Sequence, residues 1–186
     1  MKNAALVIAV MLLSSTALAQ SRTLGTFHFE DRNGNHTAKL TITTKAFEPS
    51  AHIVTTADQQ YLKRNEISLA KGVSWITKVD GMKPLGTDGS MPRVEIASMT
   101  VSFGGTKITI PAKLYADCFN PNFQKDTSAV RLTDAGDSLL VFMAGSDAAG
   151  SYQIMWIFRK DGRHSRFVNN CSDCDYSGVL DFFLKQ

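Results

Sequence analysis

The sequence has few cysteines, few prolines and little excess charge. Its 186 residues include 3 Cys and 5 Pro, and 20 Lys and Arg stand against 17 Asp and Glu. With 44% hydrophobic and 20% charged residues, this composition is typical of an ordinary globular domain and excludes a disordered or fibrous chain. Nucleic-acid binding would need a basic excess concentrated on one face, so the small charge surplus argues against a nucleic-acid partner.

Long hydrophobic runs are also absent, since no segment approaches the ~20 apolar residues that a membrane helix needs. The short apolar run of residues 4–13 follows Lys2 and precedes Ala17-Leu18-Ala19, the small-x-small pattern at which signal peptidase cuts. We therefore expect a signal peptide cleaved after Ala19, and a single periplasmic or secreted domain over residues 20–186. Removing 19 of the 186 residues leaves 167, with 19 basic against 17 acidic side chains.

Motifs for catalysis and metal binding are missing as well. The Gly-x-Ser-x-Gly motif of hydrolases does not occur, and no sequence pattern identifies a pair of catalytic carboxylates. The histidines, at positions 28, 36, 52 and 164, lack the i, i+2 or i, i+4 spacing that places two imidazoles side by side. We predict no catalytic residue, no metal site and no cofactor, although a small exported enzyme stays an alternative.

The three cysteines lie in the second half of the chain, at Cys118, Cys171 and Cys174. In an oxidising compartment an odd number favours one disulfide and one free thiol. We favour a bond that includes Cys118, because closing a loop of more than fifty residues stabilises by ~4 kcal/mol in the chain-entropy model. A local Cys171–Cys174 bond, a redox pair and a zinc knuckle are the alternatives.

Three consecutive strands with short connections organise the chain. Residues 138–144 and 152–158 are apolar on both alternating sets of positions, which predicts strands covered on both faces. A tight turn at residues 160–162 leads into the third strand.

The rest of the chain shows alternating segments divided by turn residues. An Asn33-Gly34 pair predicts a hairpin between residues 24–30 and 36–44, and Gly104-Gly105 predicts a second one. Together these patterns predict an all-β fold, an antiparallel β-sandwich or flattened barrel built from a β-meander, with at most one short helix. The further strands are expected at residues 52–56, 73–77, 94–103, 106–110 and 128–133.

Two segments do not fit the meander. Thr56 with Gln59 forms a capping-box pattern that predicts a helix over residues 56–70, with Gly72 as its stop. Residues 72–92 are rich in turn formers, and a loop this long is uncommon unless it is functional or held by its neighbours. Asp80 and Asp88 in it suggest either ordinary Asp-Gly turns or a ligand or metal site.

The connection that ends in Gly150-Ser151-Tyr152, between two apolar strands of an exported all-β chain, resembles the inhibitory loop of the periplasmic inhibitors of invertebrate-type lysozymes. The resemblance covers residues 139–156. It implies that Ser151 and Tyr152, with Ser146 and Asp147 beside them, enter a lysozyme cleft and hydrogen-bond its catalytic carboxylates.

The alternative to partner binding is that Tyr152 has a structural role in the core, because it alternates with Ile154, Trp156 and Phe158. We add Arg166 to the candidate partner-binding residues, since it points back along its strand toward this loop. The predicted function is an exported non-catalytic binding protein with a protein partner, in its most specific form a lysozyme inhibitor. A ligand binder that uses residues 72–92 and a structural envelope protein are the alternatives.

Overall fold

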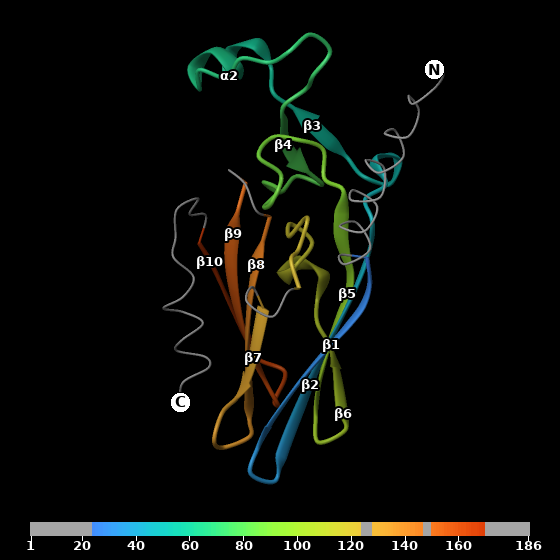
Figure 1. Cartoon of the computed structure of the whole chain (residues 1–186), viewed down its shortest axis with the longest axis vertical. Helices are drawn as coiled ribbons and strands as arrows, with labels where there is room; N and C mark the ends of the chain where they lie inside the picture. Colours follow the sequence, from blue (N-terminus) through green and yellow to red (C-terminus); the bar gives the residue numbers. More distant parts are fainter. Residues whose placement is uncertain (1–23, 124–127, 147–149, 170–186) are drawn as a thin grey trace, which may run out of the picture.

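Most of the regular structure of this chain is β-strand. The computed structural model describes residues 24–123, 128–146 and 150–169 (Figure 1). In this part of the chain, the strands form three antiparallel sheets, accompanied by the α-helix α2 (Gln59–Arg64) and two short 3-10 helices. The predicted all-β class is confirmed.

The first sheet has the strand order β1-β2-β5-β6. Its strands are β1 (Gly25–Asn33), β2 (His36–Ala46), β5 (Val94–Phe103) and β6 (Thr106–Thr109). The hairpin predicted at Asn33-Gly34 is confirmed, because Asn33 pairs with His36 and Gly34 takes a φ of +56°. Alternation places Ala38, Leu40 and Ile42 in the core.

The second sheet, ordered β10-β9-β8-β7, is a continuous meander. It consists of β7 (Ser128–Leu132), β8 (Ser138–Gly145), β9 (Tyr152–Arg159) and β10 (His164–Asn169). One face of β8 and β9 packs against the first sheet, while Phe142 and Ala144 are buried on the other face. The doubly apolar pattern of these strands therefore matches burial on both sides.

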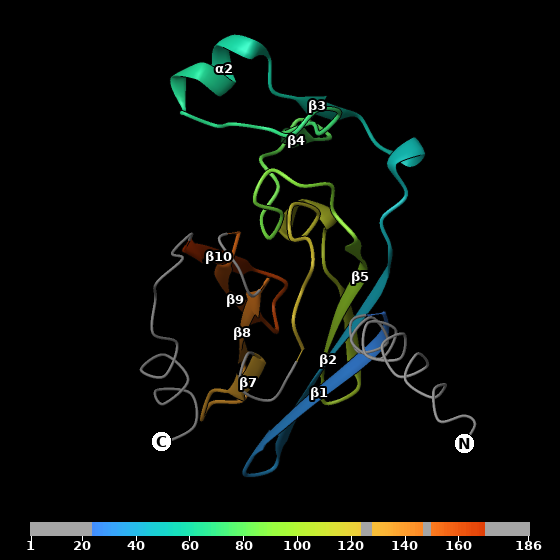
Figure 2. The same cartoon turned by 45° about the horizontal axis from the view of Figure 1, so that its top comes forward.

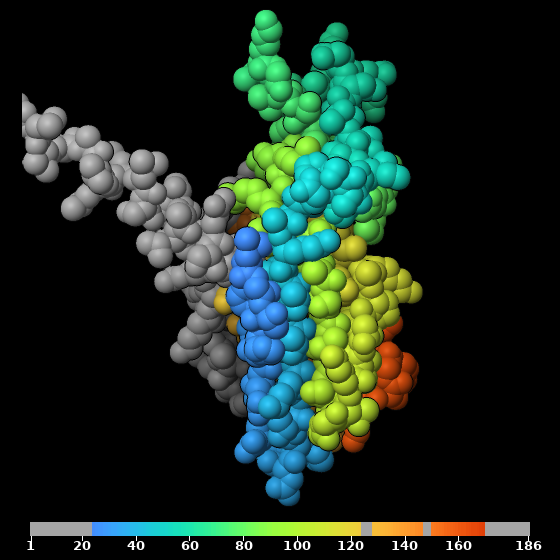
Figure 3. Space-filling model, turned by 90° about the vertical axis from the view of Figure 1, so that its right-hand side faces the viewer, coloured from blue at the N-terminus to red at the C-terminus, as the bar shows by residue number. Residues whose placement is uncertain are grey.

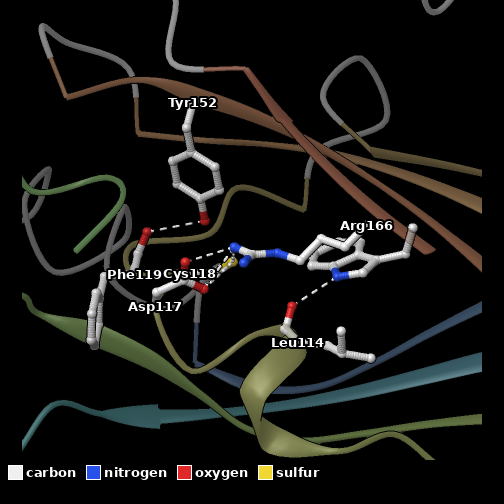
Figure 4. Close-up of polar contacts among 7 residues, drawn as sticks. Leu114, Asp117, Cys118, Phe119, Tyr152 and Arg166 are labelled. Atoms are coloured by element: carbon white, nitrogen blue, oxygen red, sulfur yellow. Dashed lines mark hydrogen bonds and ion pairs between the residues drawn. The ribbon is translucent and has the colours of Figure 1, made fainter. Parts of the chain in front are cut away.

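A segment that we call the connector, residues 110–123, crosses from the first sheet to the second and lies between them. It holds the 3-10 helix η2 (Ala112–Leu114) and contributes Leu114, Tyr115 and Cys118 to the main core. The carbonyl groups of Leu114 and Phe119 accept hydrogen bonds from the second-sheet side chains Trp156 and Tyr152, and the close-up shows the bond between Tyr152 and Phe119 (Figure 4). A polar backbone can be buried here because these partners replace water.

The opposite end of the sandwich is closed by polar contacts between the first hairpin and β7. The Asp31 carboxylate accepts the backbone N–H of Leu132 at 2.7 Å, and the Asn33 side chain donates to Asp134 at 2.8 Å. These bonds join residues about a hundred positions apart, so the two sheets are held together at both ends.

The sequence between β2 and β5, two strands that pair directly with each other, carries an insertion that projects from the first sheet. We call residues 52–80 the arm: β3 (Val54–Thr56) pairs with β4 (Ile76–Val79), and α2 lies at the far end from the sandwich (Figures 1 and 2). The predicted simple meander is therefore correct for the second sheet only.

The helix in the arm is shorter than residues 56–70, and it starts and ends at other residues than predicted. Thr56 is taken up by β3, where it pairs with Ile76, and Asp58 caps the helix by accepting the Tyr61 N–H at 2.7 Å. The helix stops at Arg64 rather than near Gly72, because Glu66 adopts a left-handed φ of +56°.

Replacement of Trp156 by Phe is expected to lower the free energy of unfolding by about 2–3 kcal/mol, since it deletes ring volume and leaves the Leu114 carbonyl unpaired in the core. Urea denaturation measures this difference. Met155→Leu, on the half-buried opposite face of the same strand, is the control and is expected to cost less than about 1.5 kcal/mol. Equal effects of the two changes would show that the connector bond does not matter.

Candidate functional site: the arm and the loops at its base

The connection between β8 and β9 lies against the turn-rich segment that precedes β5. A Cβ added to Gly150 would lie 2.6 Å from the backbone nitrogen of Asp88. At the other end, Ser146 adopts a φ of +61° and donates its N–H to the Asn120 carbonyl at 3.1 Å. Ser151 is half-buried, and Asp147 lies outside the described residues. The two segments that the sequence nominated separately thus meet at one end of the sandwich.

Tyr152 is not part of that surface. Its side chain is completely buried, and its hydroxyl donates to the Phe119 carbonyl at 3.2 Å (Figure 4). The ring covers Gly145 so closely that a Cβ there would lie 2.1 Å from it, and burial raises the pKa of the phenol well above its ordinary value. The structure therefore places Tyr152 in the core, as its alternation with Ile154 and Trp156 indicates, and leaves none of it for a partner to touch.

Arg166 also points into the sandwich. One terminal nitrogen of its guanidinium lies 2.7 Å from both carboxylate oxygens of Asp117, and the same nitrogen approaches the Cys118 sulfur at 3.7 Å (Figure 4). The two charged side chains are only 21% and 15% exposed. Arg166, which the sequence analysis placed among the partner-binding residues, thus binds the connector instead.

Cys118 is the cysteine that the structure describes, and it is a buried free thiol. Burial raises the pKa of this thiol strongly, and the neighbouring Asp117 charge adds to the effect. A thiol in this environment is a poor nucleophile. Cys171 and Cys174 lie outside the described residues, so the predicted disulfide stays a prediction.

Asn120 joins the connector to both neighbouring loops. Its side-chain oxygen accepts the backbone N–H groups of Arg93 and Val94 at 3.0 and 3.2 Å, and its amide nitrogen donates to the Gly86 carbonyl at 2.6 Å. Its own N–H donates to Val94, and its carbonyl accepts from Ser146. With a φ of +47°, Asn120 suits this position, because Asn tolerates the left-handed region.

A row of four ionisable side chains crosses the base of the arm. Lys45 lies 2.9 Å from one carboxylate oxygen of Glu95, and His52 lies 3.1 Å from the other. The second ring nitrogen of His52 bonds Asp80 at 2.7 Å. Glu95 is 7% exposed, so its carboxylate oxygens face Lys45 and His52 rather than open solvent.

This row of ionisable side chains links the arm to the first sheet. His52 and Asp80 belong to the two ends of the arm, while Lys45 and Glu95 belong to β2 and β5. The ring of His52 also stacks on Phe47 at 4.6 Å between centroids. Phe47, Ile76, Val79 and Phe119 form a small apolar cluster of their own.

The sequence did not predict the contacts among these four side chains, because the residues are up to fifty positions apart. One signal was present: Glu95 interrupts an otherwise apolar stretch at the start of β5. Asp80, which the sequence suggested for a ligand site, is engaged by His52 and by the N–H of Ile53 at 2.9 Å, whereas Asp88 is exposed.

The outer part of the arm, residues 57–75, is exposed or half-buried along its whole length. From residue 57 to residue 75 no side chain is buried, and Ile53, Tyr61 and Val73 are 75%, 38% and 56% exposed. The space-filling view shows this part as two lobes with a hollow between them (Figure 3). The hollow, which we call the arm groove, has a volume of about 480 Å³ and lies between α2 and residues 67–73.

Substitution of Tyr152 tests its place in the core. Tyr152→Ala is expected to cost about 4 kcal/mol of unfolding free energy, and Tyr152→Phe about 1 kcal/mol through loss of the bond to Phe119. Tyr61→Ala, on the exposed arm, should stay within about 0.5 kcal/mol of the unaltered protein. A Tyr152→Ala protein of unchanged stability would contradict the buried position.

The pKa of Asp80 is lowered, first by the hydrogen bond from His52 and then by the N–H of Ile53. This carboxylate therefore stabilises the fold above its ordinary pKa of about 4, and the contribution is lost as the pH falls through the lower folded pKa. In an NMR titration, the Ile53 amide signal should shift with an apparent pKa below about 4. The shift should vanish in Asp80→Asn and persist in the control Asp161→Asn, which removes a comparable carboxylate at a distant turn. A titration of the Ile53 signal at the ordinary pKa of an aspartate would contradict the lowered pKa of Asp80.

Comparison with the models of known protein families, with curated proteins and with solved structures finds no match to this chain. In the part that the structure describes, no helix is long and apolar enough to cross a membrane. The described residues also contain no group of three or more His, Cys, Asp or Glu placed to hold a metal ion. Any function has to be argued from the arm and the loops at its base.

Proposed function

We propose that this chain is an exported, non-catalytic binding protein, that the arm is its binding element, and that its partner is a cell-wall lytic enzyme of the lysozyme type. One observation carries the proposal: the outer arm, residues 57–75, has defined structure but no buried side chain. The N-terminal pattern that ends at Ala19 supports export.

The energetics of the arm favour a binding role. Ordering each residue costs about 1–2 kcal/mol of backbone entropy, which a folded segment normally recovers by burying apolar surface. The outer arm buries little, and it keeps Tyr61 and Val73 in solvent. Exposed apolar side chains on a projecting element are the usual anchors of a protein interface.

The base of the arm is built to hold this element in place. The Lys45–Glu95–His52–Asp80 row and the Phe47 cluster fasten its two ends to the first sheet. An ordered projection loses less entropy on binding than a mobile one, which increases affinity. Such a projection is suited to entering the cleft of an enzyme.

The choice of a lysozyme-type enzyme as the partner is supported by the resemblance at residues 139–156. With Tyr152 in the core, the proposal keeps Ser146, Asp147 and Ser151 as its candidate contact residues in that loop. This loop lies next to Asp88, and the adjacent Gly89 contacts Trp75 and accepts the N–H of Ile76 at 2.6 Å. A partner that grips the arm would therefore also reach the loop.

The test measures binding and inhibition with a panel of purified lysozymes and lytic transglycosylases, using surface capture and a turbidity assay on cell walls. We expect one of these enzymes to be bound and inhibited. The double variant Ile53→Ser/Val73→Ser should weaken that binding at least about thirtyfold, the loss of roughly one interface hot spot, with unchanged thermal stability.

The matched control is Leu24→Ser/Val168→Ser, which removes two exposed apolar side chains from the sandwich, 42% exposed each. It should bind as the unaltered protein does. Failure to bind any enzyme of the panel would refute the lytic-enzyme partner. Equal binding by both double variants would refute the arm as the binding element.

A further inference from the structure

The arm groove has an apolar lining. Leu62 from α2 and Ile67 and Leu69 from the segment that follows are half-buried and line the hollow seen in Figure 3. Its volume of about 480 Å³ falls in the range of roughly 300–1,000 Å³ that is typical of ligand sites. The groove can therefore take several side chains of a partner.

The charges at the groove are all of one sign. Lys63 and Lys71 line it, and no acidic residue does. Two carboxylates, Asp58 and Glu66, each lie one residue from the lining in the sequence; Asp58 caps the helix by accepting the Tyr61 N–H, and Glu66 is exposed and not part of the lining. Positive charge beside an apolar lining is complementary to a segment that combines carboxylates with apolar side chains.

The backbone of the groove wall offers free hydrogen-bonding groups. Ile67 donates its N–H to the Leu62 carbonyl, and Val73 donates to Ala70. Between them, within the described part of the chain, the N–H groups of Ser68 and Leu69 have no hydrogen-bond acceptor. An unpaired stretch of backbone can pair with an added extended segment, a common mode of peptide recognition.

We propose that the arm groove binds an extended acidic segment of the partner protein. Lys63 and Lys71 pair with its carboxylates, the backbone at Ser68 and Leu69 pairs with its main chain, and Leu62 and Ile67 contact its apolar side chains. This inference rests on the proposed function, because it names the chemistry of the partner surface that the arm recognises.

The experiment measures fluorescence anisotropy of a labelled short peptide of alternating Glu and Leu, titrated with the full chain. A Gln-Leu peptide of the same length is the comparison probe. We expect the Glu-Leu peptide to bind in the micromolar to millimolar range, at least about tenfold more tightly than the Gln-Leu peptide, with weakening as salt is added.

Two double variants separate the groove from charge in general. Lys63→Gln/Lys71→Gln should reduce binding of the Glu-Leu peptide about tenfold or more, whereas Lys107→Gln/Lys113→Gln, which removes the same charge from the sandwich, should leave it unchanged. Equal loss in both variants, or no peptide binding at about 1 mM, overturns the proposal. Binding to phosphatidylglycerol vesicles without peptide binding also overturns it, in favour of a lipid.

The lytic-enzyme assay distinguishes this failure from that of the proposed function. If the Lys63→Gln/Lys71→Gln protein captures its enzyme as well as the unaltered chain does, while Ile53→Ser/Val73→Ser does not, the groove proposal fails and the arm proposal stands. If the arm variant also binds normally, the proposed function fails with it.

Discussion

The structure depends on the burial of the connector between the two sheets. A backbone segment in a core loses its water, so each of its polar groups needs a partner there. The second sheet supplies two of these partners, since Trp156 donates to the Leu114 carbonyl and Tyr152 to the Phe119 carbonyl, and Arg166 in addition donates to the Asp117 carboxylate (Figure 4). Each donor lies on the inward face of β9 or β10, among the apolar side chains that fill the sandwich.

The connector also fixes the position of the loops that support the arm. Asn120, at the end of the connector, fixes the backbone at Gly86, Val94 and Ser146 through its five hydrogen bonds. The loop that begins at Gly86 then contacts Trp75 and Ile76 at the base of the arm. The sandwich thus serves as a platform, and the arm projects from it with its apolar side chains in solvent.

Much of the fold was predictable because strand alternation is a local property. Ala38, Leu40 and Ile42 repeat at every second position, and the strand expected at residues 94–103 matches β5 in both of its bounds. The position of Tyr152 was ambiguous in the sequence. Its alternation with Ile154 and Trp156 predicts a ring in the core, but its place at the start of a strand, directly after a loop, also allowed an exposed ring. The predicted start of the helix was wrong because two local preferences competed at Thr56. This residue pairs with Ile76 in a strand, and Asp58 caps the helix instead.

The contacts that build the site could not be predicted, because they join residues far apart in the sequence. Arg166 meets Asp117 across 49 positions, and His52 meets Glu95 only because the fold brings the base of the arm against the start of β5. Taken alone in the sequence, Arg166, Asp117 and His52 show no sign of these contacts. The arm groove has the same origin, since the helix ends at Arg64 and the chain turns back along it.

Native-state hydrogen exchange of the full chain tests the account most directly, because it reports the opening free energy of each backbone amide. If the connector is the centre of the fold, the amides of Phe119 and Asn120 should exchange only through global unfolding, at the slow rate of β5, β8 and β9. The hydrogen-bonded amides of Leu62, Asn65 and Ile67 in the outer arm should exchange much faster, through local opening that leaves the platform intact. Connector amides that exchange as fast as those of the arm, or arm amides as protected as the core, would contradict this division between a platform and a projecting binding element.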